Sequence, residues 1–238
     1  MDLLLVEKGL AESREKAKAI IMAGEVEVNG SRIDKPGHTV DALSEISVKS
    51  PYPPYVSRGG LKLEAVLDHF SIDVTGKTLL DIGASTGGFT DCLLQRGADR
   101  IIAVDVGYGQ FHWKLRQDPR VILLEKTNAR NLTQDQINET VNGAVIDVSF
   151  ISLALILPPI TAILQDGSFV AALIKPQFEV GRHQVGKGGV VRDPKLHNDV
   201  IKKITGICES LGYRISGTIP SPVIGPKGNR EFLIYAEK

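Results

Sequence analysis

The stretch TLLDIGASTGGFT, residues 78–90, decides the fold of most of this 238-residue chain. An apolar segment typical of a buried strand runs into a glycine-rich turn, and a helical pattern follows. Glycines let the backbone turn sharply and approach a ligand closely, and a helix start offers free N–H groups. The stretch therefore predicts a strand–loop–helix unit that binds a small molecule.

The spacing of the glycines narrows the ligand class. Glycines at 83, 87 and 88 do not match the Gly-x-Gly-x-x-Gly dinucleotide fingerprint, and no lysine follows them as in a phosphate-binding loop. Asp81 enters the loop, where a carboxylate suits the cationic amino group of S-adenosylmethionine better than a diphosphate. Asp105 ends the next strand and can hold a ribose diol. The alternative is a tight strand–helix turn and a solvated Asp105.

Strands alternate with helical patterns on both sides of this stretch. Lys62 to Phe70 is predicted as a leading helix and Lys195 to Leu211 as the last long helix. Tyr213 to Ile219 and Glu231 to Tyr235 follow with no helix between them, so they should pair antiparallel. The other predicted strands are Thr78 to Ile82, Arg100 to Val106, Val121 to Glu125, Ala144 to Val148 and Ser168 to Ile174. This pattern predicts an α/β fold, a doubly wound Rossmann-like sheet with an antiparallel last strand.

Two lysines and two acids should meet above the carboxyl ends of the parallel strands, where this architecture places its active site. Asp147 ends the fourth strand and Lys175 the fifth, while Glu231 starts the antiparallel last strand at the same rim. Lys62, on the helix before the first strand, can lie across it. Each charge alone is more often a surface charge or salt bridge, so the prediction depends on all four.

The chemistry of such a group indicates a ribose hydroxyl as methyl acceptor. That hydroxyl must lose its proton as it attacks a methyl carbon, and a lysine can take the proton only when its own pKa is lowered. Burial and a second lysine lower that pKa, whereas the acids limit the effect and orient the ammonium group. We assign Lys175 as the central base, Asp147 and Glu231 as its orienting partners, and Lys62 as a second cation near the acceptor.

A different pattern fills residues 1–50. Ser13 is a good N-cap for a helix from Arg14 to Ala23, which Gly24 closes. Val26 and Val28 alternate with acids before the hairpin turn Asn29-Gly30, and Val40 to Val48 predicts further strand. The prolines that follow suit neither a helix interior nor a central strand. We therefore expect a small α+β domain at 1–50, a linker at 51–57 and the larger domain at 58–238.

Composition excludes several classes of protein. Lys plus Arg equal Asp plus Glu at 28 each, so attraction for a polyanion must come from local patches. Cys92, Cys208 and the five histidines show no ligand spacing, so we expect core cysteines and no metal. The longest apolar stretch, Ile151 to Leu164, contains two prolines and is shorter than the roughly 20 residues of a membrane span. With no signal-peptide pattern, a cytoplasmic protein without membrane contact is expected.

These motifs match a known family over essentially the whole chain. The chain resembles the TlyA-type, or haemolysin A, family of ribosomal-RNA 2′-O-methyltransferases, related to the FtsJ group. The segments that carry the resemblance are Ser13 to Ala17, Gly24 to Gly30, Val56 to Leu63, Asp81 to Thr90, Glu125 to Arg130, Asp147 to Ser152, Lys175 to Glu179 and Ser221 to Phe232.

The resemblance implies a site and a substrate. It implies an N-terminal RNA-binding fold named after a small-subunit ribosomal protein, ribosomal RNA or ribosomal subunits as partners, and cytidine as the methylated nucleotide. It also places a Lys-Asp-Lys-Glu tetrad on Lys62, Asp147, Lys175 and Glu231. The expected cofactor contacts are Asp81, Gly83, Ser85, Thr86, Gly87, Gly88, Phe89, Asp105, Asn128 and Asp147. The chain starts at Met1-Asp2-Leu3 without the short basic lead expected of dual-target members, which leaves the choice of subunit open.

Basic and aromatic residues give candidate RNA contacts. Arg14 and Lys18 share one helix face and can contact phosphates, although a solvated face is the ordinary alternative. The full expected set is Arg14, Lys16, Lys18, Arg58, Arg182 and Lys187. The glycine-rich segment from Gln177 to Arg192 is either a lid that orders on RNA or an ordinary surface loop. Phe150 and Phe178 can stack on the target base, and Trp113 is expected to be buried or beside the adenine.

Two other functions compete with methyl transfer. A non-catalytic ribosome-assembly factor could keep the cofactor fold as a scaffold for RNA binding. A haemolysin-like membrane-active protein is suggested by the family's older name, but the sequence shows no export signal, spanning segment or strongly basic amphipathic face.

Overall fold

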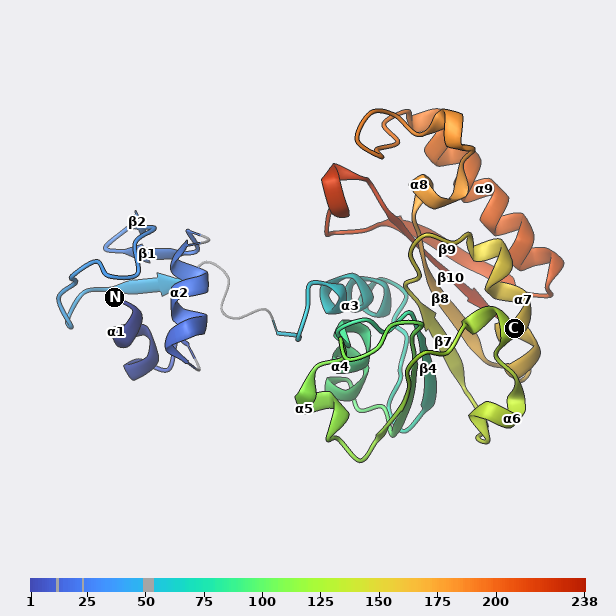
Figure 1. Ribbon diagram of the computed structural model, residues 1–238, viewed down its shortest axis with the longest axis horizontal. Helices are drawn as coiled ribbons and strands as arrows, with labels where there is room; N and C mark the ends of the chain where they lie inside the picture. The colour runs from blue at the N-terminus through green and yellow to red at the C-terminus, as the bar shows by residue number, and fades with distance from the viewer. Residues whose placement is uncertain (12, 23, 49–53) are drawn as a thin grey trace. The chain divides into compact units, whose positions relative to one another are not determined.

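The structure is a computed structural model that describes residues 1–11, 13–22, 24–48 and 54–238, without the side chains of Ala19 and Arg182. The chain forms two compact units, Met1–Pro54 and Tyr55–Lys238, both drawn in Figure 1. Residues 55–57, expected in the linker, pack into the larger unit, since Tyr55 is buried and Val56 N donates to Asp91 Oδ2 at 2.8 Å. The start of the linker stays a prediction, because residues 49–53 lie outside the described part.

The smaller unit packs two helices against a three-stranded antiparallel sheet of order β2-β1-β3, with Leu5, Ile21 and Val26 in its core. Lys16 N donates to Ser13 Oγ at 3.3 Å, which confirms the predicted N-cap. Asn29 and Gly30, both at positive φ, form the predicted hairpin turn. The elements are α1 (Asp2–Glu7), α2 (Arg14–Met22), β1 (Val26–Val28), β2 (Ser31–Ile33) and β3 (Ile46–Val48).

The strand predicted from Val40 to Val48 is wrong in its first half, because only Ile46–Val48 forms β3. Leu43 N donates to Asp41 Oδ1 at 2.8 Å and Ser44 N to Asp41 O at 3.0 Å. A short acidic side chain that bonds the backbone two residues on favours a turn over a strand. The turn leaves Leu43 93% exposed.

The larger unit is an α/β domain. Its strands are β4 (Thr78–Ile82), β5 (Arg100–Val104), β6 (Val121–Leu124), β7 (Gly143–Ile146), β8 (Phe169–Ile174), β9 (Arg214–Pro220) and β10 (Phe232–Glu237). Its α-helices are α3 (Gly59–His69), α4 (Gly88–Gln95), α5 (Trp113–Arg116), α6 (Gln134–Ile137), α7 (Leu157–Ile163), α8 (Pro176–Glu179) and α9 (Pro194–Ser210). Four 3-10 turns complete it: η1 (Ala129–Asn131), η2 (Leu153–Leu155), η3 (Arg182–Gln184) and η4 (Pro226–Gly228).

The seven strands follow the order β6-β5-β4-β7-β8-β10-β9. The strands β4 to β8 pair parallel, whereas β10 pairs antiparallel with both β8 and β9. This confirms the predicted Rossmann-like sheet and its antiparallel last strand. Strands β5 and β6 are added on one side of β4, and strands β7 and β8 on the other. The strand order therefore switches between β4 and β7, and such a switch point opens a ligand crevice at the carboxyl ends of the strands.

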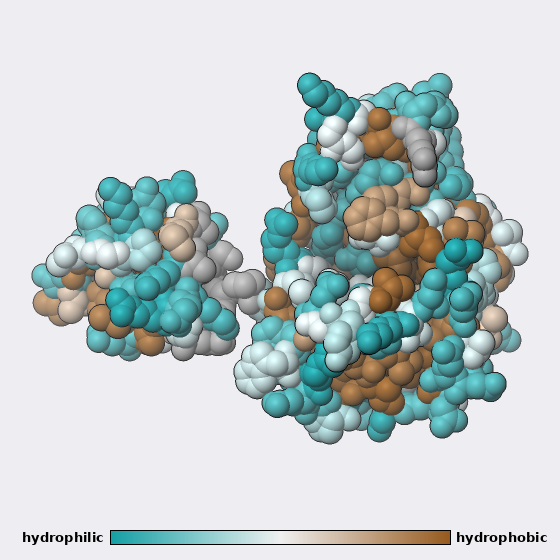
Figure 2. Space-filling model, viewed as in Figure 1, coloured by the Kyte–Doolittle hydropathy of each residue, from teal (hydrophilic) through white to brown (hydrophobic). Residues whose placement is uncertain are grey.

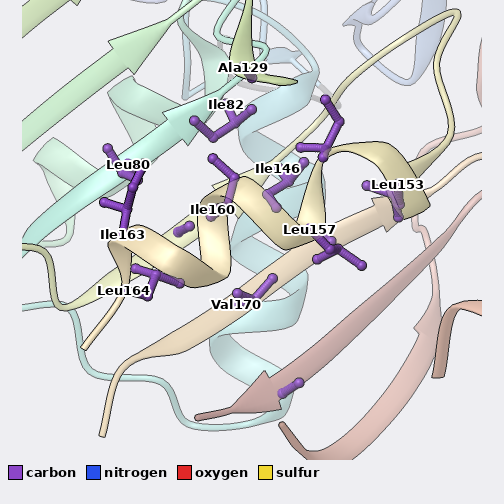
Figure 3. Packing of buried hydrophobic residues seen from close by; sticks show 14 of the residues in the cluster. Leu80, Ile82, Ala129, Ile146, Leu153, Leu157, Ile160, Ile163, Leu164 and Val170 are labelled. Atoms are coloured by element: carbon purple, nitrogen blue, oxygen red, sulfur yellow. The ribbon is translucent and has the colours of Figure 1, made fainter. Parts of the chain in front are cut away.

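Helices cover both faces of the sheet, and a layer of buried hydrophobic residues lies between the sheet and the helices on each face (Figure 1). One layer contains Leu63 of α3 and Leu93 of α4, and the other contains Ile160 of α7 and Ile204 of α9. Figure 3 shows the second layer, in which α7 lies across the strands and inserts its leucines and isoleucines among those of β4, β7 and β8. Cys92 and Cys208 are buried in these layers, as predicted. Burial raises the pKa of the Cys208 thiol to about 11.

The surface is mixed in character. In the view of Figure 2, hydrophilic residues cover most of each unit, and hydrophobic residues gather at the middle of the larger one. Within the described residues, every helix is too short or too polar to cross a bilayer.

Candidate active site

Two buried ion pairs lie at the carboxyl edge of the sheet. Lys62 Nζ of α3 is 2.5 Å from Glu231 Oε2, just before β10, across 169 residues of sequence. Lys175 Nζ, after β8, is 2.5 Å from Asp147 Oδ1, after β7, and donates to Ser149 Oγ at 2.8 Å. The two lysine side chains are only 10% and 9% exposed. Removing charges from water costs free energy, so largely buried ion pairs indicate a role beyond the solubility of the surface.

One carboxylate oxygen of each pair still lacks a hydrogen bond. Glu231 Oε1 and Asp147 Oδ1 are both buried without a hydrogen-bond partner in the described part of the chain. The close approach of Lys175 to Asp147 is therefore an ion pair whose angle is not that of a hydrogen bond. Asp147 Oδ1 is occupied by the Lys175 ammonium group, so Glu231 Oε1 is the buried acceptor that stays available to a bound molecule.

The four charged residues line a single cavity of about 670 Å³. Its other walls come from the loop after β4, the start of α3, α8 and the turn before β10. The predicted residues found in this wall are Lys62, Asp147, Lys175, Glu231, Gly83, Ser85, Thr86, Gly88, Phe89, Arg58, Phe150 and Phe178. The pairing differs in one respect from the prediction, because Glu231 contacts Lys62 and was expected to orient Lys175.

A second cavity of about 430 Å³ adjoins the first at the switch point. Gly83, Ser85 and Asp147 line both cavities, and Asp105 and Asn128 line the second. Asp105 Oδ2 accepts from Ser85 N at 2.7 Å and Oδ1 from Gly107 N at 2.6 Å, so the carboxylate is held rigidly at the cavity wall. These backbone contacts were not predicted, and they replace the freely solvated carboxylate of the alternative interpretation.

Gly83 explains why the loop contains glycine. Its φ is +86°, and a Cβ there would lie 2.6 Å from the backbone oxygen of Asp147. Only glycine allows the loops after β4 and β7 to approach so closely. The approach brings the cofactor loop and the acid of the Lys175 pair to one crevice.

Asp81 is completely buried beneath the loop and does not line either cavity. Thr90 Oγ1 donates to its Oδ2 at 2.6 Å, while Oδ1 has no hydrogen-bond partner in the described part. Burial, with Asp147 and Asp105 nearby, raises the pKa of this carboxyl to about 7. Asp81 could interact with a ligand in either cavity only through a water molecule or after a small movement of the loop.

The structure separates other predicted residues from the cavities. Gly87, at φ +95°, faces Leu115 and Phe111 instead, so its role is to fit the loop against the protein. Arg14 donates to Asp2 Oδ2 at 2.7 Å, so this predicted phosphate contact is already ion-paired. Lys16 is exposed and Lys18 half-buried in the smaller unit, and Lys187 is exposed in the larger. The Arg182 side chain lies outside the described residues.

The expected burial of Trp113 is wrong. Trp113 is 67% exposed and lines neither cavity, because α5 is only one turn long and turns this residue to solvent. The segment 177–192, expected as a lid or an ordinary surface loop, includes the end of α8 and all of η3 and buries Val190 and Val191. Asn229 holds it, accepting from Val191 N at 3.1 Å and donating to Gly189 O at 3.0 Å.

Sequence reasoning missed the wall formed by residues 223–229. Val223, Ile224, Gly225 and Lys227 line the larger cavity. Gly225 is required there, because a Cβ would lie 2.3 Å from Glu231 Oε1. The signal for this wall in the sequence is the spacing Gly225-Pro226-x-Gly228 just before the acidic start of a strand.

Glu179 ties the segment after β8 to the loop after β7. Its carboxylate is buried and accepts from Ser152 Oγ at 2.6 Å, Leu153 N at 2.7 Å and Lys203 Nζ at 3.1 Å. Glu179 is the last residue of α8, which follows Lys175, whereas Ser152 follows Asp147 and Phe150. Phe150, at φ +63°, also contacts Phe178, with ring centroids 5.0 Å apart.

Replacing Glu179 with leucine should therefore lower the free energy of unfolding by about 2–4 kcal/mol. The change leaves Leu153 N and Ser152 Oγ buried without an acceptor. Urea denaturation of both proteins measures it. The matched control is Lys202→Met on the same helix, which should change stability by less than about 0.5 kcal/mol because this lysine is exposed. Equal stability of Glu179→Leu and wild type would contradict the tie.

Comparison with known proteins agrees with this geometry. The family model for FtsJ-like methyltransferases matches residues 55–238, and that for the S4 domain matches residues 2–46. The chain is 53% identical over 236 residues to YqxC of Bacillus subtilis, named as a candidate rRNA methyltransferase, covering 99% of this chain and 84% of the relative. It is 45% identical over 236 residues to the 16S/23S rRNA (cytidine-2'-O)-methyltransferase TlyA of Mycobacterium tuberculosis, covering 99% and 88%.

A solved structure of a hemolysin-named protein from Streptococcus thermophilus is similar over the full chain. It has 48% sequence identity and a TM-score of 0.79, and the match covers 100% of this chain and 87% of that one. Family models and full-length relatives thus agree on the same two parts. The chain belongs to the FtsJ-like methyltransferase family and carries an N-terminal S4 domain.

Proposed function

We propose that the protein transfers a methyl group from S-adenosylmethionine to the ribose 2′-hydroxyl of a cytidine in ribosomal RNA. The observation that carries this proposal is the single cavity in which both lysine–carboxylate pairs lie beside the glycine loop. The relative named as an rRNA (cytidine-2'-O)-methyltransferase supports the choice of nucleotide and RNA. Ribosomal RNA as substrate implies that the protein works in the cytoplasm, on RNA or on ribosomal subunits.

The residues present fit this cofactor. Gly83 lines both cavities, Asp105 and Asn128 line the smaller one, and Asp81 offers an orphaned carboxylate oxygen to a cation. S-adenosylmethionine supplies an electrophilic methyl group and carries a positive charge. Ser85, Thr86, Gly88 and Phe89 would shape the wall on the methionine side.

Lys175 is placed to take the proton of the acceptor hydroxyl as the neutral amine, after its own ammonium proton has left to solvent through the cavity. Asp147 and Ser149 hold its Nζ on the cavity side of the sheet edge, and Asp147 can share the proton that the amine receives. Lys62, fixed by Glu231, places a second positive charge in the same wall, where it stabilises the oxygen as it becomes negative. Phe150, 90% exposed at the mouth, would stack on the target base together with Phe178.

The S4 unit and exposed basic residues would bind the RNA. Lys16 and Lys18 lie on its helix α2, and Arg58 precedes α3 in the wall of the larger cavity. Arg14 would have to exchange Asp2 for a phosphate. Lys187, and Arg182 by sequence, would contribute from the segment above α8.

Mapping of the product tests the proposal. The purified protein is incubated with S-adenosylmethionine labelled in its methyl group and, separately, with small subunits, large subunits and naked ribosomal RNA. A label on the ribose of a cytidine is the expected result, and a label on a base overturns the proposal. Binding of RNA with no transfer to any of the three would favour the assembly-factor alternative.

A further inference from the structure

Two exposed aromatic residues lie next to the candidate active site without lining its cavities. Tyr108 is 69% and Trp113 is 67% exposed. Both follow β5. His112, just before Trp113, donates its backbone N–H to Thr86 O of the cofactor loop at 3.2 Å. Large aromatic side chains gain about 1.5–3 kcal/mol each when they are buried, so a pair left in solvent at a functional edge indicates a partner.

The turn after β6 holds a cation over the first of these rings. Lys126 Nζ lies 4.3 Å from the ring centroid of Tyr108. The turn is fixed to the Tyr108 loop, because Lys126 N donates to Gly107 O at 3.1 Å and Thr127 N to Asp105 O at 2.9 Å. Lys126 has φ +54°, a conformation that is uncommon for a residue with a side chain. The strained backbone therefore presents a lysine and an aromatic ring as one unit.

Arg116 neutralises one acid beside this surface, and backbone N–H groups hold the other in place. Glu125 accepts two bonds from Arg116, at 3.0 and 2.7 Å, and one from Gly109 N at 2.7 Å. Both oxygens of Asp105 accept backbone N–H groups. Lys114 and Lys126 are exposed, and neither has an ion pair with any residue that the structure describes. Local charge is thus positive although the chain is neutral overall, which complements a polyanion.

We infer that Tyr108, Trp113, Lys114 and Lys126 form a stacking platform for unpaired RNA nucleotides beside the target nucleotide. Aromatic faces stack on bases of any sequence, and lysines between them contact phosphates, which is how single-stranded nucleic acid is held. The platform extends the RNA path across the ends of β5 and β6, away from Phe150 and Lys187. This inference rests on the proposed function for its RNA substrate, and it adds that the nucleotides flanking the target are single-stranded.

Trp113 is the only tryptophan of the chain, so its fluorescence reports directly on the platform. Titration of the full chain with an unlabelled single-stranded RNA, in the absence of cofactor, should quench that fluorescence. A fully paired RNA duplex of the same length should quench it much less. Because no methyl transfer is needed, the result stands even if the proposed reaction fails. Lack of quenching by single-stranded RNA that demonstrably binds would overturn the platform.

Substitutions separate stacking from phosphate contact. Tyr108→Leu and Trp113→Leu should each weaken RNA binding about 5- to 150-fold, with an unchanged dependence on salt. Lys126→Gln should weaken binding and lower the slope of log affinity against log salt by about one. The matched control is Lys77→Gln. Lys77 Nζ also lies over an aromatic ring, 5.6 Å from the ring centroid of Phe169, but at the amino ends of the strands, opposite the candidate active site.

The same variants distinguish a platform residue from one that binds cofactor or supports the fold. Cofactor affinity and the melting temperature should stay at the wild-type values, since the replaced side chains are exposed and line neither cavity. A loss of cofactor affinity in Trp113→Leu would instead place this residue in the cofactor site and overturn the inference. RNA binding as tight as wild type in both Tyr108→Leu and Trp113→Leu would also overturn it.

Discussion

Replacing Lys175 with methionine is expected to lower the rate of methyl transfer about 10²–10⁴-fold, the range for losing a general base. Lys175 Nζ contacts both Asp147 and Ser149 at the cavity wall, and its side chain is only 9% exposed. Methionine keeps most of the packing volume and cannot accept a proton. Transfer measured in single turnover with saturating cofactor checks the chemical step itself. Cofactor affinity, measured by calorimetry, should be unchanged.

Lys62→Met is the comparison variant, because loss of this lysine should lower stability whereas loss of Lys175 should mainly lower the transfer rate. Glu231, the partner of Lys62, has no side-chain exposure, so removing the lysine leaves a buried carboxylate without its counter-charge. Such a loss costs about 3–5 kcal/mol of stability. Asp147, by contrast, is 21% exposed and can be hydrated when Lys175 is replaced. A stable Lys175→Met protein with near-normal transfer would remove Lys175 from the mechanism.

Replacing Asp81 with asparagine should make the cofactor-free protein more stable and weaken cofactor binding. The carboxyl is completely buried, and its pKa is raised from 3.8 to about 7, chiefly by burial. A shift of that size corresponds to about 4 kcal/mol of free energy. Asparagine has nearly the same shape, can still accept from Thr90 Oγ1, and carries no charge to desolvate. The gain should therefore approach about 4 kcal/mol at pH 8, less the cost of one unpaired amide N–H.

The pH dependence of this gain has a definite sign. A carboxyl whose folded pKa is raised binds its proton more tightly in the native state. Below pH 3.8 the group is protonated in both states and costs nothing, so the variant and wild type should be equally stable there. The cost of ionising Asp81 grows as pH rises from about 4 to about 7 and is complete above that. Urea denaturation at several pH values measures the difference.

Cofactor binding supplies the second measurement for Asp81. We expect an ionised carboxylate to attract the cationic cofactor, so wild-type affinity should fall as pH drops below about 7, whereas Asp81→Asn should bind weakly at every pH. Thr90→Val removes a hydrogen bond that lowers the Asp81 pKa, so cofactor affinity in this variant should begin to fall at a higher pH than in the wild type. Wild-type cofactor affinity in Asp81→Asn would show that this residue acts only on the fold.

The sheet and the meeting of charged residues could be predicted from sequence because both follow from local patterns. The apolar run before Gly83 predicted β4 at Thr78–Ile82, and the absence of a helix between the last two strands predicted their antiparallel pairing. Once Asp147, Lys175 and Glu231 stand at strand ends, the parallel sheet brings them to one rim. Which lysine pairs with which acid could not be predicted, because it depends on side-chain direction across that rim.

The unpredicted features depend on partners distant in sequence. The segment 177–192 looks flexible from its glycines, yet Asn229 holds it from about forty residues away. The six-residue helix α1 is too short for a helical period to be recognised. Burial of Asp81 and the exposure of Trp113 likewise depend on how neighbouring elements pack, which no window of adjacent residues records.

The Lys62–Glu231 pair can form only late in the synthesis of the chain. Its partners are 169 residues apart, and β10, which follows Glu231, lies between β8 and β9 in the sheet. A growing polypeptide exposes Lys62 early but cannot form the pair until Glu231 has left the exit tunnel and β10 has inserted between its neighbours. The wall that these two side chains form is therefore completed only after nearly all of the larger unit has been synthesised.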